Sequence, residues 1–184
     1  MTDRWRSEKL RRPRGIVQPV VQRLADELST ANPELEFHFG GSWRRGAEVI
    51  GDIDILIVTE TGSLNPNLLD PGVQLPSSIV YQRFGDKVAQ GDVPLPDGPL
   101  HIDIWSCRPQ ERGAYLMFTA GPMALNLYQR RHAKRHGMAL SQIGLLDATT
   151  KQQLDNGTEE DIYRILGLRW LEPHERQAWA DRSH

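Results

Sequence analysis

The sequence predicts an α+β protein in which a mixed β-sheet with flanking helices is followed by a small, mostly helical lobe. Two observations carry this prediction. Apolar and polar residues alternate, as they do in half-buried strands, over residues 35–39, 52–58 and 99–105, whereas residues 14–30 and 121–137 show helical spacing. A chain of 184 residues forms one ordinary domain or two small lobes that share a cleft.

The first half of the chain is predicted to build the sheet. Ile16, Val20, Leu24 and Leu28 recur four residues apart, which predicts an amphipathic helix over 14–30. The turn-forming Asn32-Pro33 pair follows it. After these come a strand at 35–39, a turn or short helix at 42–51, a strand at 52–58, a Pro- and Gly-rich loop at 61–78, a hairpin-like pair at 79–84 and 87–90, a loop at 91–98 and a strand at 99–105.

The second half is predicted to be helical. The segment 121–137 has Pro122 near its start and Gly137 at its end, and these residue types commonly mark the start and the end of a helix. Thr158 and Asp161 stand in capping-box positions before another apolar helical run. We therefore predict a basic N-terminal arm over 1–13, the sheet domain over 14–106 and the C-terminal lobe over 107–184.

Composition limits the class of protein. The hydrophobic content of 39% with 25% charged residues is typical of a globular chain, and a single cysteine, Cys107, permits no internal disulfide. No apolar stretch is long enough for a signal peptide or a membrane span. We expect a soluble, cytoplasmic and monomeric protein whose Cys107 packs in the interior.

Basic residues are concentrated in two blocks, although the net charge is −2. Residues 1–14 carry six Arg or Lys and two acids, and residues 130–136 carry four Arg or Lys, two His and no acid. Such blocks are typical of a protein that binds a polyanion through a few basic segments, although each block alone could equally be solvated surface charge. We predict that DNA is bound by the second block, through Arg130, Arg131, Lys134 and Arg135, with the arm as an auxiliary clamp.

Three carboxylates are predicted to share one face of the sheet. Asp52 and Asp54 are two residues apart in one strand and therefore project from the same face. Asp103 holds an equivalent place in the strand 99–105, so neighbouring strands could bring all three together. A single strand Asp is more often a surface residue, but oxygen-rich clusters suit Mg²⁺ or Mn²⁺.

The turn upstream of these acids has the residue types that bind phosphate. Gly40 and Gly41 allow backbone N–H groups to approach an anion closely. Ser42 offers a hydroxyl, and Arg45 a fork that can bind two phosphate oxygens. Joined at short range to the two acids, the turn predicts a triphosphate held beside metal ions.

These residues resemble a known family. The stretch GSWRRGAEVIGDIDILIV (residues 41–58), with Asp103 in HIDIW, is similar to the palm of the DNA polymerase beta-like family X polymerases. The likeness continues in residues 117–137 and 158–176, in the family's order. The chain has no room for the family's amino-terminal lyase domain and resembles its shortest viral members, reduced to palm and C-terminal lobe.

The resemblance implies a nucleotidyltransferase palm and template-directed addition of deoxynucleotides to a primer 3′-hydroxyl, as in the filling of short gaps during DNA repair. The implied cofactor is a pair of Mg²⁺ ions, with Mn²⁺ as a possible substitute, and the implied partners are gapped or primer-template DNA and deoxynucleoside triphosphates. Arg130 would reach the template. Implied metal ligands and catalytic residues are Asp52, Asp54 and Asp103, and implied nucleotide-binding residues are Gly41, Ser42, Arg45, Gly51, Phe118, Gly121 and Asn126.

The chain departs from the family pattern at a few positions. His101 replaces an arginine that commonly precedes the third acid, which leaves open what supports Asp103. Met117 replaces an aromatic residue, Ala120 is an extra residue, and Met123 replaces a polar one, so sugar discrimination and fidelity are open.

Other functions stay open on the residues alone. A template-independent or small-molecule nucleotidyltransferase would use the same acids, but a small acceptor needs no cationic helix. A DNA-binding module without catalysis would be expected to have lost some of the three carboxylates. An α/β domain whose acids are merely solvated is the remaining possibility.

Overall fold

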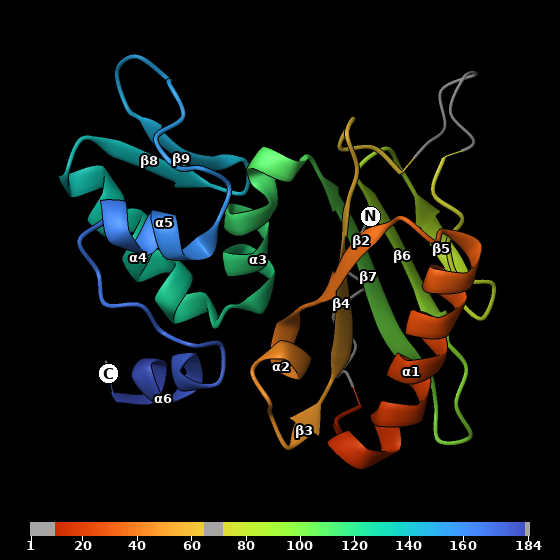
Figure 1. The fold of residues 1–184 in the computed structure, drawn as a ribbon. Helices are drawn as coiled ribbons and strands as arrows, with labels where there is room; N and C mark the ends of the chain where they lie inside the picture. Colours follow the sequence, from red (N-terminus) through yellow and green to blue (C-terminus); the bar gives the residue numbers. More distant parts are fainter. Residues whose placement is uncertain (1–9, 65–71, 183–184) are drawn as a thin grey trace, which may run out of the picture.

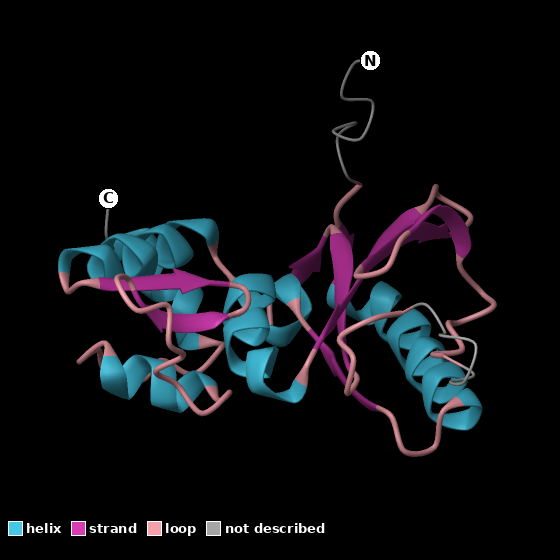
Figure 2. Cartoon of the chain, turned by 90° about the horizontal axis from the view of Figure 1, so that it is seen from above, coloured by secondary structure: helices cyan, strands magenta, loops and turns pink. Residues whose placement is uncertain are grey.

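The computed structural model describes residues 10–64 and 72–182. The part of the predicted arm at 1–9 and the part of the predicted loop at 65–71 lie outside the described residues. Figure 1 shows a sheet with helix α1 on one side and, beside it, a lobe built mainly of helices. Figure 2 shows the same two parts side by side from above. The predicted α+β class is confirmed.

The sheet has five strands in the order β2-β4-β7-β6-β5. β4 and β7 are parallel, and the other neighbours are antiparallel, so the sheet is mixed. The predicted acid-bearing strands are β4 and β7, which are neighbours in the interior of the sheet, and β5 with β6 is the predicted hairpin-like pair. The bounds are β2 (Glu36–Phe39), β4 (Asp52–Val58), β5 (Val80–Phe84), β6 (Val88–Val93) and β7 (Leu100–Cys107).

Helix α1 (Arg14–Ala31) covers one face of this sheet. Its buried stripe is Val17, Val20, Val21, Leu24 and Leu28, which packs with Ile53, Ile55 and Ile102 in the main core. The prediction that Ile16 joins the stripe is wrong, since this side chain is 58% exposed. The core-facing stripe follows the 3.6-residue helical period through Val17 and Val21, which strict i+4 counting omits.

A small β-ladder fixes the end of the predicted N-terminal arm. β1 (Arg12–Pro13) pairs antiparallel with β3 (Val49–Ile50), the strand that leads into β4. Arg12 is 2% exposed and forms an ion pair with Asp97 at 3.0 Å, and it also donates to the carbonyl of Gly98 at 2.7 Å. Arg12 therefore fastens this segment to the fold and is not available to clamp DNA.

The second lobe contains more elements than predicted. The expected helices are present as α4 (Met123–Arg135) and α5 (Glu159–Ile165). Thr158 caps α5 by accepting from the Asp161 N–H at 3.3 Å, but the Asp161 carboxylate accepts from the N–H of Asn156, so only half of the capping box forms. Elements not predicted individually are η2 (Pro109–Glu111), α3 (Arg112–Ala120), β8 (Met138–Ser141), β9 (Gly144–Asp147) and α6 (Glu175–Arg182).

Two main cores and a smaller joint between them hold the molecule together. The lobe has its own core around Leu125, Ile162 and Tyr163. The joint is a cluster of Leu56, Cys107, Tyr115 and neighbours, which packs α3 against β4 and β7. Cys107 is fully buried, as predicted. Within residues 10–64 and 72–182, no helix has the length and apolar character needed to cross a membrane.

Candidate active site

The acids lie in register on one face of the sheet, the face opposite the core. In β4, Ile53 and Ile55 are fully buried while Asp52 and Asp54 are half-buried, so the alternation separates apolar from charged side chains. Asp54 stands directly opposite Asp103 of the parallel strand β7. Adjacent strands lie about 4.8 Å apart, so these two acids are near neighbours.

Two acids on this face of the sheet, Asp103 and Asp92, contact polar side chains of neighbouring strands. Gln90 of β6 is opposite Asp103, and its Nε2 donates to Asp103 Oδ1 at 2.6 Å. His101 of β7 stands between Asp52 and Asp92 in the register, and its Nδ1 contacts the Asp92 carboxylate. The sequence had not pointed to Gln90. Alternation along 88–93 is the signal that could have placed it on the acid-bearing face.

The glycine turn, formed by Gly40 and Gly41, lies directly against Asp54. α2 (Gly41–Arg44) opens at Gly40, whose N–H donates to the Asp54 carbonyl at 2.7 Å. Gly41 has φ +61°, and a Cβ placed on it would lie 2.3 Å from Asp54 Oδ2. A side chain here would strain the backbone and displace the Asp54 carboxylate, so the position strongly favours glycine.

Arg45, at the end of α2, joins the turn to the second lobe. Its Nη1 donates to the carbonyl of Ala120, and Asp54 and Asp52 act on it electrostatically. Burial lowers the pKa of Arg45, and the charges of the two acids oppose that shift. The guanidinium stays charged at neutral pH, because arginine is not deprotonated in proteins. It therefore places a permanent cation beside the two acids.

A cleft of about 870 Å³ runs between the sheet and the second lobe. Asp103 lies instead in an adjoining hollow of about 330 Å³ with Gln90 and His101. Ten predicted site residues line the cleft: Gly41, Ser42, Arg45, Gly51, Asp52, Asp54, Phe118, Gly121, Asn126 and Arg130. Arg11 of the predicted basic arm also lines the cleft, as do residues that the sequence had not indicated, among them Glu48, Thr119, Leu127 and Gln177.

The lobe side of the cleft is built by α3 and α4. Asn126 Nδ2 donates to the carbonyl of Phe118 at 3.0 Å, which fixes the amide at the edge of the cleft. The Arg130 guanidinium carbon lies 5.7 Å from the centre of the Phe118 ring, within the range of a cation–π contact. Asn126 and Arg130 thus share one face of α4, as their spacing predicted. Met123 is 74% exposed at the same wall.

The remaining basic residues of α4 do not line the cleft. Arg131, Lys134 and Arg135 are exposed. None of them forms an ion pair with an acid among the described residues. The structure thus divides the predicted DNA-binding group into one cleft residue, Arg130, and three exposed cations outside it.

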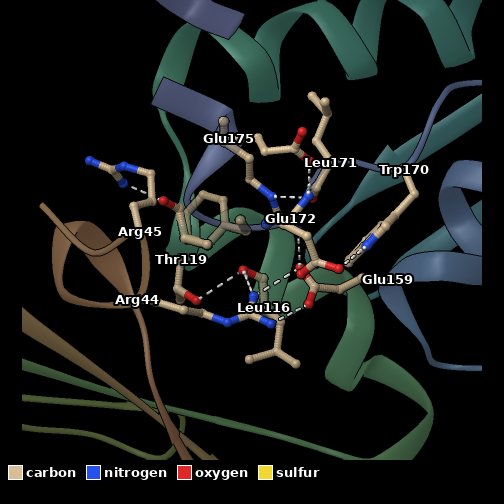
Figure 3. A network of polar contacts seen from close by, with 12 residues as sticks. Arg44, Arg45, Leu116, Thr119, Glu159, Trp170, Leu171, Glu172 and Glu175 are labelled. Atoms are coloured by element: carbon tan, nitrogen blue, oxygen red, sulfur yellow. Dashed lines mark hydrogen bonds and ion pairs between the residues drawn. The ribbon is translucent and has the colours of Figure 1, made fainter. Parts of the chain in front are cut away.

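A buried ionic group ties the glycine turn to the second lobe (Figure 3). Arg44 of α2 donates from its two terminal nitrogens to the Glu159 carboxylate of α5, Nη1 to Oε1 at 2.9 Å and Nη2 to Oε2 at 2.5 Å. Arg176 of α6 lies with its Nη2 3.0 Å from Glu159 Oε1, the oxygen that also accepts from Arg44 Nη1. Glu159 is 4% exposed and Arg176 1% exposed. One carboxylate therefore fixes the position of α2 relative to the helices across the cleft.

The donor set can be compared with what a metal ion requires. Carboxylate oxygens on adjacent strands are the ligands that Mg²⁺ and Mn²⁺ prefer. Nevertheless, across residues 10–64 and 72–182 no three His, Cys, Asp or Glu side chains are gathered into a group that could hold a metal ion. Asp103 is turned to Gln90 in its own hollow. The chemistry of these carboxylates fits a divalent ion, although the three do not form one group in this structure.

Comparison with known proteins gives two family matches. Residues 11–82 match the model of the DNA polymerase beta palm, and residues 114–177 match that of the DNA polymerase beta thumb. The first segment contains α1, the glycine turn and strands β2 and β4 and ends within β5, whereas β6 and β7 lie outside both segments. The second segment contains most of α3 together with α4 and α5. Of the predicted site residues, only Asp103 lies outside them.

Individual relatives agree with these matches. The chain is 30% identical to DNA polymerase lambda of Rattus norvegicus and 27% identical to DNA polymerase lambda of Arabidopsis thaliana, over 90% and 91% of its own length. It spans only 33% and 37% of those two proteins. It is also 23% identical to the repair DNA polymerase X of African swine fever virus, over 74% of this chain and 78% of the viral protein.

Proposed function

Because this chain belongs to family X of the DNA polymerases, we propose that it is a template-directed DNA polymerase that adds deoxynucleotides to a primer 3′-hydroxyl. The observation that carries the proposal is the register of the sheet, which sets Asp54 opposite Asp103 with Asp52 on the same face. One chain has the acids, the glycine turn and the basic helix, so the proposed activity requires only a monomer.

Asp52, Asp54 and Asp103 would hold two Mg²⁺ ions, or Mn²⁺ in their place. Ions held by these carboxylates would supply the charge that lowers the pKa of a primer hydroxyl and that offsets the charge of the triphosphate and of the leaving pyrophosphate. Because Gly41 has no side chain, its backbone lies directly against the Asp54 carboxylate. An anion bound at this turn would therefore lie directly beside the metal ligands.

The nucleotide and the template would be bound by opposite walls of the cleft. Ser42, Arg45 and the backbone of Gly51 bind the β and γ phosphates, and the exposed Arg11 adds a cation on the same side. On the lobe side, Phe118 and Gly121 lie beside the sugar and Asn126 meets the base edge. Positioning of this kind is the larger part of what a protein contributes to phosphoryl transfer.

DNA outside the cleft would be held by α4. Arg130 reaches the template strand at the cleft, while Arg131, Lys134 and Arg135 bind phosphates along the duplex. The preferred substrate is proposed to be a short gap in DNA, as expected for repair. The prediction that the N-terminal arm adds to the grip concerns residues 1–9 and the exposed Arg11, since Arg12 is occupied by Asp97.

Primer extension tests the proposal. The assay compares one-nucleotide-gapped, open-template and single-stranded DNA, with each deoxynucleotide and with Mg²⁺ or Mn²⁺. We expect template-dependent addition that is strongest on the gap. Asp103→Ala should abolish addition while DNA binding persists, and Asp26→Ala, on the exposed side of α1, should change nothing. Turnover of Asp103→Ala within about tenfold of the wild type would contradict the three-acid site. Equal addition without a template would indicate a template-independent nucleotidyltransferase.

A further inference from the structure

The acid-bearing face of the sheet is organised in rows that run across the strands. One row contains Asp54, Asp103, Gln90 and Arg83, from β4 through β7 and β6 to β5. The preceding row contains Asp52, His101 and Asp92. Side chains that stand directly opposite each other in adjacent strands lie within about 5.5 Å at Cβ, so each residue interacts first with its row neighbours.

Within the first row, Gln90 has a specific contact with Asp103. Its Nε2 lies 2.6 Å from Asp103 Oδ1, a short distance for an N–H···O bond, as is typical when the acceptor is charged. Both side chains are half-buried, so water competes only partly for the carboxylate. A carboxylate that is bound through one oxygen is restricted in rotation, and its second oxygen has a defined direction.

His101, which stands where the family commonly has an arginine near the third acid, contacts another acid than Asp103. His101 lies two positions earlier on the same strand and contacts Asp92 in the other row. Gln82 of β5 also donates to Asp92, so His101 and Gln82 share one acid. The two rows therefore form separate contacts, Gln90 with Asp103 and His101 with Asp92.

We propose that Gln90 is a positioning residue that orients Asp103 for metal binding, an inference that rests on the proposed function of this site. The partners that orient a metal-binding carboxylate commonly matter almost as much as the ligand itself. An amide can fix the carboxylate without adding a positive charge. The site thus keeps its full negative charge for divalent ions, with Arg45 as its neighbouring cation.

Gln90→Met is the decisive variant, because methionine has a similar length and no N–H donor. Gln82→Met is its matched control, since Gln82 makes the same kind of amide–carboxylate contact with Asp92, which is not among the proposed metal ligands. Gln90→Glu is the second variant, because it keeps the shape and replaces the donor with a negatively charged acceptor. Thermal unfolding of all three establishes that each is folded.

Two measurements report on the position of Asp103. Mn²⁺ binding is titrated by electron paramagnetic resonance on the full chain with gapped DNA, a dideoxy-terminated primer and the matching nucleotide, so that no chemistry occurs. Primer extension then gives kcat and the nucleotide KM. For Gln90→Met we expect Mn²⁺ affinity and kcat to fall by about 10–100-fold with little change in KM, and for Gln90→Glu a larger fall.

Several results would overturn the inference. Gln90→Met within about twofold of the wild type in both Mn²⁺ affinity and kcat would show that the contact does not position the acid. An equal loss in Gln82→Met would show a general disturbance of the sheet. A wild-type chain that extends no primer would refute the proposed function instead, while the Mn²⁺ titration would still decide the role of Gln90.

Discussion

The ionic group that joins the glycine turn to the second lobe gives the sharpest prediction about stability. Glu159→Gln removes the only negative charge between Arg44 and Arg176 in this group and leaves the shape of the side chain almost unchanged. Arg176 is 1% exposed, so water cannot replace the lost carboxylate. Its Nη2 lies 3.0 Å from Glu159 Oε1 without the alignment of a hydrogen bond, so the contact is chiefly ionic.

The expected loss of unfolding free energy in Glu159→Gln follows from the burial of the two arginines. Removing one partner of a buried ion pair costs about 3–5 kcal/mol of unfolding free energy. The Arg44 side chain is 22% exposed and will be partly solvated, which places the expected loss near the lower end, at about 3 kcal/mol. For a chain of this length, such a loss lowers the melting temperature by about 6–12 °C.

Urea unfolding followed by tryptophan fluorescence measures this loss. Arg164→Ala is the control. The Arg164 side chain is 73% exposed, so the loss of its ion pair with Asp161 should leave the urea midpoint unchanged. The same variants should be compared in primer extension, since α2 also contains Ser42. A loss below about 1 kcal/mol for Glu159→Gln would refute the view that this carboxylate fastens the turn to the lobe.

Three further predictions concern single residues. Gly41→Ala should cost more than about 1 kcal/mol in thermal unfolding and abolish primer extension, because its Cβ would meet Asp54 at 2.3 Å; Gly46→Ala, with φ +72° and no atom within 4 Å, should cost only the backbone strain. Lys134→Ala should flatten the salt dependence of DNA affinity by about 0.9 in a log–log titration, and an unchanged slope would mean that Lys134 does not contact phosphate. Burial raises the pKa of the Cys107 thiol from 9.0 to about 12, so the unfolded chain loses this proton first and stability should fall as pH rises from 9 towards 12; an equal fall in Cys107→Ser would refute this cause.

The elements that the sequence predicted correctly are those in which local pattern and tertiary environment agree. β4 has an acid-bearing face and an aliphatic face, so its alternation was visible in the sequence. α3 was not predicted as a separate helix because residues 113–117 are buried in an unbroken run, which leaves no polar stripe to reveal a period. The strands of the β8–β9 hairpin are four residues each, too short for alternation to be distinguished from chance.

The candidate site, too, could be predicted from the sequence only as far as local pattern reaches. Spacing in the sequence placed Asp52 and Asp54 on one face, but it could not say which strand would lie beside them. The parallel pairing of β4 with β7 is a property of the topology, and it sets Asp103 opposite Asp54. Gln90 required one more neighbour, the antiparallel strand β6. Each further strand across the sheet adds a register that no local pattern encodes.

The two basic blocks show that charge in the sequence does not by itself reveal which cations are available to bind a polyanion. In the sequence they are alike, yet Arg12 is buried against Asp97, and Arg14 lies 3.7 Å over the ring of Trp43. A cation that is already compensated inside the fold gains little from a phosphate, because that contact would require the internal one to break. Lys134 and Arg135 project from the end of α4 into solvent with no acid of the described chain paired to them. Their charge is uncompensated, and it is this part of α4 that a polyanion would neutralise most favourably.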